Sequence, residues 1–74
     1  EMFRMTDIQT LGKMVSRLPL VQQEIIHLRF YEDLSFKEIA QITNVSINTA
    51  LGRMRYATLN LRKMMVENSL DLAI

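Results

Sequence analysis

Cysteine and tryptophan are absent from the 74-residue chain, which contains one proline and two glycines. Without cysteine, the chain has no disulfide bond, no thiolate metal site and no cysteine nucleophile, which suits the reducing cytoplasm where we expect the protein to act. No apolar run approaches the roughly 18 residues that a membrane-spanning helix needs. No signal-peptide pattern opens the chain either, so we expect no membrane partner. So little proline and glycine permits long helices.

Residue groups that carry out catalysis or bind metals are missing as well. His27 is the only histidine, and without cysteine or a second histidine beside it a metal site is not expected. No Ser-His-Asp set, no pair of catalytic carboxylates and no phosphate-binding glycine loop can be assembled. We therefore predict that the chain is not an enzyme and that it needs no metal or cofactor.

Acidic residues are also missing from one long stretch, since none occurs between Glu38 and Glu67. Residues 39–66 hold four basic and no acidic residues, a charge of +4, while the remaining five basic and eight acidic residues give −3 and the whole chain +1. The four basic residues are Arg53, Arg55, Arg62 and Lys63. A charge distribution as uneven as this lets one face of a protein bind a polyanion.

Arg53 and Arg55 have no acidic residue three or four positions away, although exposed basic helices usually gain stability from such neighbours. We therefore expect Arg53 and Arg55 to bind an external anion such as the phosphates of DNA. For Arg62 and Lys63, an equally good explanation is that they offset the helix dipole at the C-terminal end.

Apolar spacing predicts an all-α fold, a small four-helix domain formed by residues 1–74 as a single unit. Residues 1–34 are expected to form two supporting helices, the first over about residues 7–17. Pro19 suits the first position of the second helix, which we expect to end near Tyr31 and to have a buried stripe. The residues of that stripe are Val21, Ile25 and Leu28.

Residues 35–65 have the spacing of a helix-turn-helix, of the winged-helix-like DNA-binding type but without a wing. Ser35 and Glu38 form a capping box that begins a short third helix. Asn44 tolerates the left-handed backbone of a tight turn. Ser46 then caps a recognition helix over about residues 46–65, and residues 66–74 form a frayed tail. The residues expected to face the core are Phe36, Ile39, Ala40, Ile42, Ile47, Ala50, Met54, Ala57, Leu61 and Met64.

The opposite side of the recognition helix is polar and basic. With a rotation of about 100° per residue, Asn48, Gly52, Tyr56 and Lys63 point away from the core, with Thr49, Arg53 and Arg55 on the flanks. Gly52 destabilises a helix interior by about 1 kcal/mol relative to alanine. Close approach to the floor of a DNA groove would explain this glycine. A neutral substitution that the helix tolerates would explain it equally well.

Residues 18–62 resemble region 4, the C-terminal DNA-binding domain of bacterial sigma factors of the extracytoplasmic-function (ECF) group of the sigma-70 family. The matching pairs include Leu18-Pro19, Leu28-Arg29, Leu34-Ser35, Val45-Ser46 and Leu61-Arg62, together with Glu38-Ile39-Ala40, Thr49, Arg53 and Ala57. The resemblance implies that the recognition helix lies in the major groove of the promoter −35 element. The contacts it implies there come from Asn48, Thr49, Leu51, Gly52, Arg53, Arg55 and Tyr56, and Arg29 would hold the phosphate backbone.

The resemblance also implies partners and a function. Members direct RNA polymerase to initiate transcription, bind double-stranded promoter DNA and grip the flap of the polymerase β subunit through their first helices. Many are masked by an anti-sigma factor. The chain departs from the usual pattern at four positions, where members commonly carry a basic residue at Leu51, Ser at Gly52, and Arg at Tyr56 and Gln23. Arg55 lies on the adjacent flank and compensates for one of the missing charges.

Two other functions remain open at this point. The DNA-binding effector domain of a response regulator shares the Glu-Ile-Ala helix and the turn, although its exposed helix ends differently. A sigma-like helical protein-interaction module without DNA affinity would also tolerate the charges missing at Leu51 and Tyr56. Both alternatives keep the same fold class.

Overall fold

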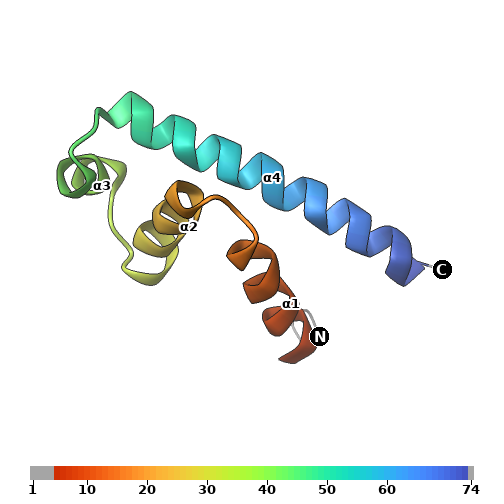
Figure 1. Cartoon of the computed structure of the whole chain (residues 1–74). Coiled ribbons are helices and arrows are strands. Elements are labelled where there is room, and N and C mark those ends of the chain that lie inside the picture. The colour runs from red at the N-terminus through yellow and green to blue at the C-terminus, as the bar shows by residue number, and fades with distance from the viewer. Residues whose placement is uncertain (1–4, 74) are drawn as a thin grey trace.

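The computed structural model describes the backbone of residues 5–73 and the side chains of residues 11–67. Within that range the chain forms four α-helices and one π-helical segment, and no strand. They are α1 (Met5–Ser16), α2 (Leu20–Ile26), the π-helical η1 (His27–Tyr31), α3 (Phe36–Thr43) and α4 (Ile47–Ala73) (Figure 1). The predicted all-α fold class with a helix-turn-helix is confirmed.

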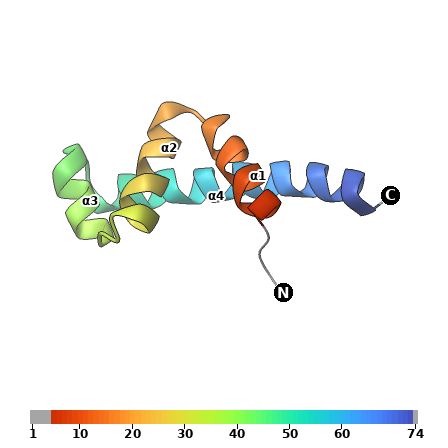
Figure 2. The ribbon, with the colours of Figure 1, turned by 90° about the horizontal axis from the view of Figure 1, so that it is seen from below.

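The long helix α4 organises the molecule, because the other helices pack along one side of it. Figure 1 shows α3, α2 and α1 arranged in that order beneath α4, from its N-terminal towards its C-terminal end. Seen from below in Figure 2, the three helices follow one another along α4, and Figure 1 shows no helix on the other side of α4. The resulting shape is elongated, with extents of 44 × 20 × 18 Å.

The core lies where α2, α3 and α4 meet, and alanines make up much of it. Ile39, Ala50 and Ala57 have no exposed surface, and Ala40 retains 5%. Small side chains at these positions let α3 and α4 approach closely, and Ala40 faces the core as predicted. The cluster also includes Leu18, Ile25 and Ile26, and the side chains packed against it include Val15, Leu28, Phe36, Val45, Met54, Leu61 and Met64.

Three residues predicted to be buried are exposed instead. The exposed fractions are 45% for Val21, 62% for Ile42 and 46% for Ile47. Each lies within the first or last two residues of its helix, where the neighbouring helix no longer covers it. Helical periodicity indicates the side on which a residue lies, but not how far along the helix its neighbour extends.

The helix-turn-helix follows the local signals of the sequence. The Ser35 N–H donates to Glu38 Oε1 at 2.8 Å and the Glu38 N–H donates to Ser35 Oγ at 3.1 Å, which confirms the capping box. These contacts, first with the Ser35 backbone N–H and then with its side chain, hold the pKa of the Glu38 carboxyl below its usual value. Ser46 Oγ accepts from the Thr49 N–H at 3.0 Å and so caps α4 as predicted.

Asn44 makes the turn between α3 and α4 in the left-handed conformation expected of it, with φ 59° and ψ 45°. The Val45 N–H donates to the Ala40 carbonyl at 3.0 Å, and the Asn44 N–H donates to the Gln41 carbonyl at 3.3 Å. This pair of hydrogen bonds is a Schellman motif, which satisfies carbonyls at the end of α3.

The second predicted helix reaches Tyr31 as expected, but its last turn is π-helical. In η1 the Glu32 N–H donates to the His27 carbonyl at 3.1 Å. The rings of His27 and Tyr31 stack with centroids 5.4 Å apart. Phe30 and Tyr31 are left 67% and 78% exposed. Single π-turns inside helices occur frequently at functional sites.

The predicted end of the recognition helix near residue 65 was wrong, because α4 continues to Ala73. Residues 66–73 contain no glycine or proline to stop the helix, so it extends past the supporting helices. The sequence also suggests that the tail docks through Leu70, Leu72 and Ile74, and these side chains lie outside residues 11–67, for which side chains are described. The first helix occupies Met5–Ser16, close to the predicted residues 7–17.

Candidate nucleic-acid interface

The N-terminal half of α4 carries seven of the eight side chains that the sequence identified as DNA contacts. None of the seven is buried in the core. Asn48 and Thr49 are exposed, Tyr56 is 64% exposed, and Gly52 and Arg53 are half-buried on the same side of the helix. These five residues form the outward face of α4, the name used below. The helix-turn-helix holds this face away from α1, α2 and α3.

Thr49 is positioned by the cap that begins α4. The Ser46 hydroxyl donates to Thr49 Oγ1 at 3.0 Å, while the Thr49 N–H donates to Ser46 Oγ at the same distance. Because Thr49 Oγ1 accepts this bond, its own hydroxyl hydrogen remains available to donate to an exposed partner. The cap therefore fixes a polar group at the N-terminal edge of the outward face.

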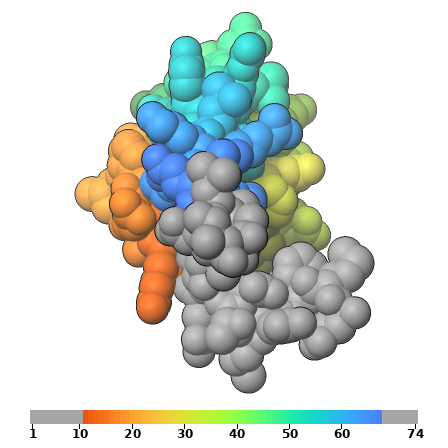
Figure 3. Space-filling model, turned by 90° about the vertical axis from the view of Figure 1, so that its right-hand side faces the viewer, coloured from red at the N-terminus to blue at the C-terminus, as the bar shows by residue number. Residues whose placement is uncertain are grey.

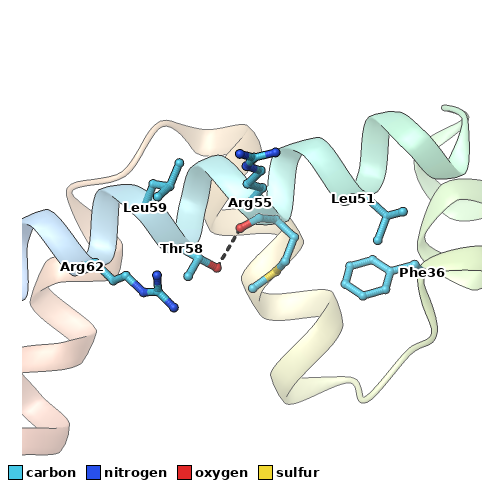
Figure 4. A pocket seen from close by; sticks show the side chains of 7 residues that line it. Phe36, Leu51, Arg55, Thr58, Leu59 and Arg62 are labelled. Carbon is cyan, nitrogen blue, oxygen red and sulfur yellow. Dashed lines mark hydrogen bonds between the residues drawn. The ribbon is translucent and has the colours of Figure 1, made fainter.

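Leu51 and Arg55 lie on a neighbouring flank of α4, above a shallow hollow of about 470 Å³. The hollow is lined by Phe36, Leu51, Met54, Arg55, Thr58, Leu59 and Arg62, so α3 contributes as well as α4 (Figure 4). Leu51 faces the Phe36 ring, and the Thr58 hydroxyl donates to the Met54 carbonyl at 2.8 Å. The hollow combines four apolar side chains with Thr58 and two arginines. Of the two arginines, Arg55 lies nearer to the outward face.

The four basic residues of α4 have no anionic partner among the described side chains, residues 11–67. Among the side chains of residues 11–67, one contact lies at salt-bridge distance, between His27 Nε2 and Glu32 Oε2 at 3.2 Å, and neither residue belongs to α4. Arg53, Arg55, Arg62 and Lys63 make no ion pair with a described carboxylate. This agrees with the charge pattern of the sequence, and it leaves the cations of α4 open to an external anion.

Arg29, the eighth predicted contact, lies on η1 and holds the connection to α3. Its Nη1 donates to the Leu34 carbonyl at 2.9 Å, and its guanidinium carbon lies 4.9 Å from the centre of the Phe36 ring. In the same connection, Asp33 takes a left-handed φ of 56°. The sequence did not reveal this internal role. Because a guanidinium has five N–H donors, Arg29 still has donors left for a phosphate.

Gln23 also has an internal role that sequence reasoning missed. Its Nε2 donates to the Leu18 carbonyl at 2.8 Å and to the Ser16 carbonyl at 3.1 Å, which closes the connection between α1 and α2. One residue earlier, Gln22 Oε1 accepts from Asn60 Nδ2 at 2.8 Å and joins α2 to α4. The amide at position 23 therefore supports the fold where family members commonly carry arginine.

A second surface, the apolar groove, lies between α1, η1 and α4. It has a volume of about 520 Å³, and its lining side chains are Leu11, Val15, Ile26, Phe30, Tyr31 and Leu61. None of these side chains is charged, and the two aromatic rings from η1 stand at its edge. Figure 3 shows α4 (blue) between the α1–α2 segment (orange) and the residues near η1 (yellow).

Comparison with known proteins identifies relatives of the chain. The family model described as "Sigma-70, region 4" matches residues 8–53, from α1 into the N-terminal half of α4. The chain is 36% identical over 55 residues to the ECF RNA polymerase sigma factor RpoE of Cereibacter sphaeroides. The alignment covers 74% of this chain and 30% of that protein, so the chain spans less than a third of this relative. No solved structure matches.

Both matches agree with the resemblance drawn from residues 18–62. They favour a sigma region over the effector domain of a response regulator. Among the described residues, no helix combines the length and apolar content that crossing a membrane requires.

Proposed function

Because the chain belongs to the sigma-70 region 4 family, we propose that it recognises the promoter −35 element as part of an ECF sigma factor and so directs RNA polymerase to initiate transcription. Region 4 domains bind DNA and carry out no catalysis, so the chain is not an enzyme. The site of action is the bacterial cytoplasm.

The single observation that supports this proposal best is the outward face of α4. A helix-turn-helix places its second helix in the major groove, with its N-terminal residues against base edges. In this chain that helix begins after the capping residue Ser46, turns a polar face outward and carries cations that have no acidic partner within residues 11–67. DNA phosphates would supply the missing anions, and the groove would accommodate the polar side chains.

The proposed contacts divide into three groups. Asn48, Thr49, Gly52, Arg53 and Tyr56 on the outward face would meet base edges and the groove wall. Leu51 and Arg55 on the neighbouring flank would meet the sugar-phosphate backbone at the side of the groove. Arg29 would reach a phosphate with the donors that Leu34 does not use.

We assign the apolar groove to RNA polymerase. A partner helix with an apolar face would cover Phe30 and Tyr31, which are otherwise left largely in water. The flap of the polymerase β subunit is the partner that family resemblance suggests, and an anti-sigma factor would compete by covering the same surfaces. Replacing Phe30 with serine should weaken binding of a purified β-flap domain and leave DNA affinity unchanged.

The test of DNA recognition begins with selection of bound sequences from a random duplex pool, followed by fluorescence anisotropy. We expect Arg53→Ala to weaken binding to the selected duplex by about 1–3 kcal/mol if Arg53 reads a base. Arg17→Ala, a change of the same residue type in the connection between α1 and α2, is the matched control and should leave affinity unchanged.

Salt dependence gives a second readout. If about four phosphates are neutralised, the logarithm of the binding constant should fall with a slope near −3.6 against the logarithm of salt concentration. Equal affinities for the wild type and Arg53→Ala, or no measurable duplex binding at low salt, would contradict the proposal. The second outcome would favour a helical protein-interaction module that uses the apolar groove alone.

A further inference from the structure

Gly52 lies inside α4 without a structural need for glycine. Its φ is not positive, so the backbone does not require it. A Cβ added at Gly52 would meet no heavy atom within 4 Å, so internal packing does not require it either. Because glycine destabilises a helix interior relative to alanine, the chain gives up stability at this position for no gain inside the molecule.

The space over Gly52 forms a notch in the outward face. Side chains three and four positions away surround a helical residue. Here these are Asn48 and Thr49 one turn before Gly52, and Arg55 and Tyr56 one turn after it, and all four are exposed. None of them reaches within 4 Å of the Cβ position. The notch therefore has polar walls and a floor of bare helix backbone.

We propose that Gly52 is a specificity-determining position, at which the edge of one DNA base pair enters the notch and occupies the space that a Cβ would fill. The inference deepens the proposed function and depends on it. Glycine serves in proteins where a backbone must approach a ligand closely. At the centre of a face that meets the major groove, the ligand nearest to the bare backbone is a base edge, whereas phosphates lie towards the sides of the groove.

Binding and stability respond in opposite directions to Gly52→Ala, which makes the inference testable. The variant should melt at a higher temperature than the wild type, because alanine favours the helix and nothing obstructs its methyl group. Its affinity for the duplex selected by the wild type should fall about tenfold or more, the range typical of a mismatched base pair. Its affinity for a scrambled duplex should stay within about twofold, since non-specific binding comes from phosphates.

Gly12 in α1 supplies the matched control. It also lies inside a helix, has no positive φ, and has no heavy atom within 4 Å of an added Cβ. Gly12→Ala should therefore raise the melting temperature like Gly52→Ala, while affinity for both duplexes stays unchanged. Gly52→Ser is the second variant, and selection from the random pool should return a site altered at one base pair.

The outcomes separate this inference from the proposed function. If the wild type binds its selected duplex and Gly52→Ala binds it equally well, the glycine is a neutral substitution and the inference is wrong. If affinity falls equally on the selected and scrambled duplexes, the notch faces the sugar-phosphate backbone, and the assignment to a base edge is overturned. If the wild type shows no preference for any duplex, the proposed function itself fails.

Discussion

Replacing Arg29 distinguishes an internal role in the fold from a role in binding phosphate. In the structure, the Arg29 guanidinium donates to the Leu34 carbonyl and lies over the Phe36 ring. Family resemblance suggests instead that its charge holds the DNA backbone. Arg29→Lys keeps the charge but loses the planar group that stacks and donates in a fixed direction. Arg29→Ala loses both.

The expected loss in the free energy of unfolding follows from the two internal contacts of Arg29. A hydrogen bond from a charged donor contributes about 1.5–3 kcal/mol. The stacking of the guanidinium on Phe36 adds about 0.5–1 kcal/mol. We therefore expect Arg29→Ala to lower the free energy of unfolding by about 2–4 kcal/mol and Arg29→Lys by about 1–2 kcal/mol. A domain of this size is stable by about 4–11 kcal/mol, so either loss is readily measured.

Urea unfolding followed by circular dichroism at 222 nm measures these changes, with Arg17→Ala as an exposed arginine control that should shift stability by less than about 0.5 kcal/mol. DNA affinity is then measured for each variant at a temperature where all of them are folded. If Arg29→Lys and Arg29→Ala both unfold at the wild-type urea concentration, the internal role is refuted. If Arg29→Ala loses only DNA affinity, Arg29 acts on phosphate alone.

Other predictions concern the helix ends and the core. Ser35→Ala should lower stability by about 1 kcal/mol, because it removes the acceptor that caps α3. The lowered pKa of Glu38 contributes stability that is present above its ordinary value of 4.5 and lost as the pH falls through the folded-state pKa, so urea unfolding of Glu38→Gln should vary less with pH in that acidic range. Asn44→Gly should keep wild-type stability in thermal melts, whereas Asn44→Val should lower it by about 1–3 kcal/mol. Ile39→Ala, at a position with no exposed surface, should lower it by about 2–5 kcal/mol, and a wild-type urea midpoint for that variant would contradict the assigned core.

Sequence reasoning succeeded where the signal is local. Ser35, Asn44 and Ser46 act through hydrogen bonds or backbone angles within a few residues of themselves, so their roles could be predicted without tertiary structure. The outward face of α4 was also predictable, because helical rotation depends on sequence position alone. For the same reason, Asn48 and Tyr56 could be assigned to one side before any coordinates were known.

Features that depend on where other helices lie could not be predicted in this way. Helical rotation placed Arg55 on a flank, and the resemblance alone gave Leu51 as a DNA contact, but neither showed that both residues line one hollow with Phe36 of α3. The internal role of Arg29 depends on a loop carbonyl and a ring brought together by the fold. The π-helical turn of η1 follows from no recognised sequence pattern. Phe30, which lies within this turn, is 67% exposed.

α4 gives up stability on its outward face in two independent ways, and both have the same physical explanation. Arg53, Arg55 and Arg62 lack the acidic residues three or four positions away that would stabilise an isolated helix, and the centre of the outward face is glycine rather than alanine. On the core side of the same helix, Ala50 and Ala57 are buried, and no described buried side-chain nitrogen or oxygen lacks a hydrogen-bond partner. A helix shaped only by folding would be expected to improve both sides. This asymmetry is expected of a helix whose outward face is completed by a polyanion that fits closely against its backbone, as we propose for promoter DNA.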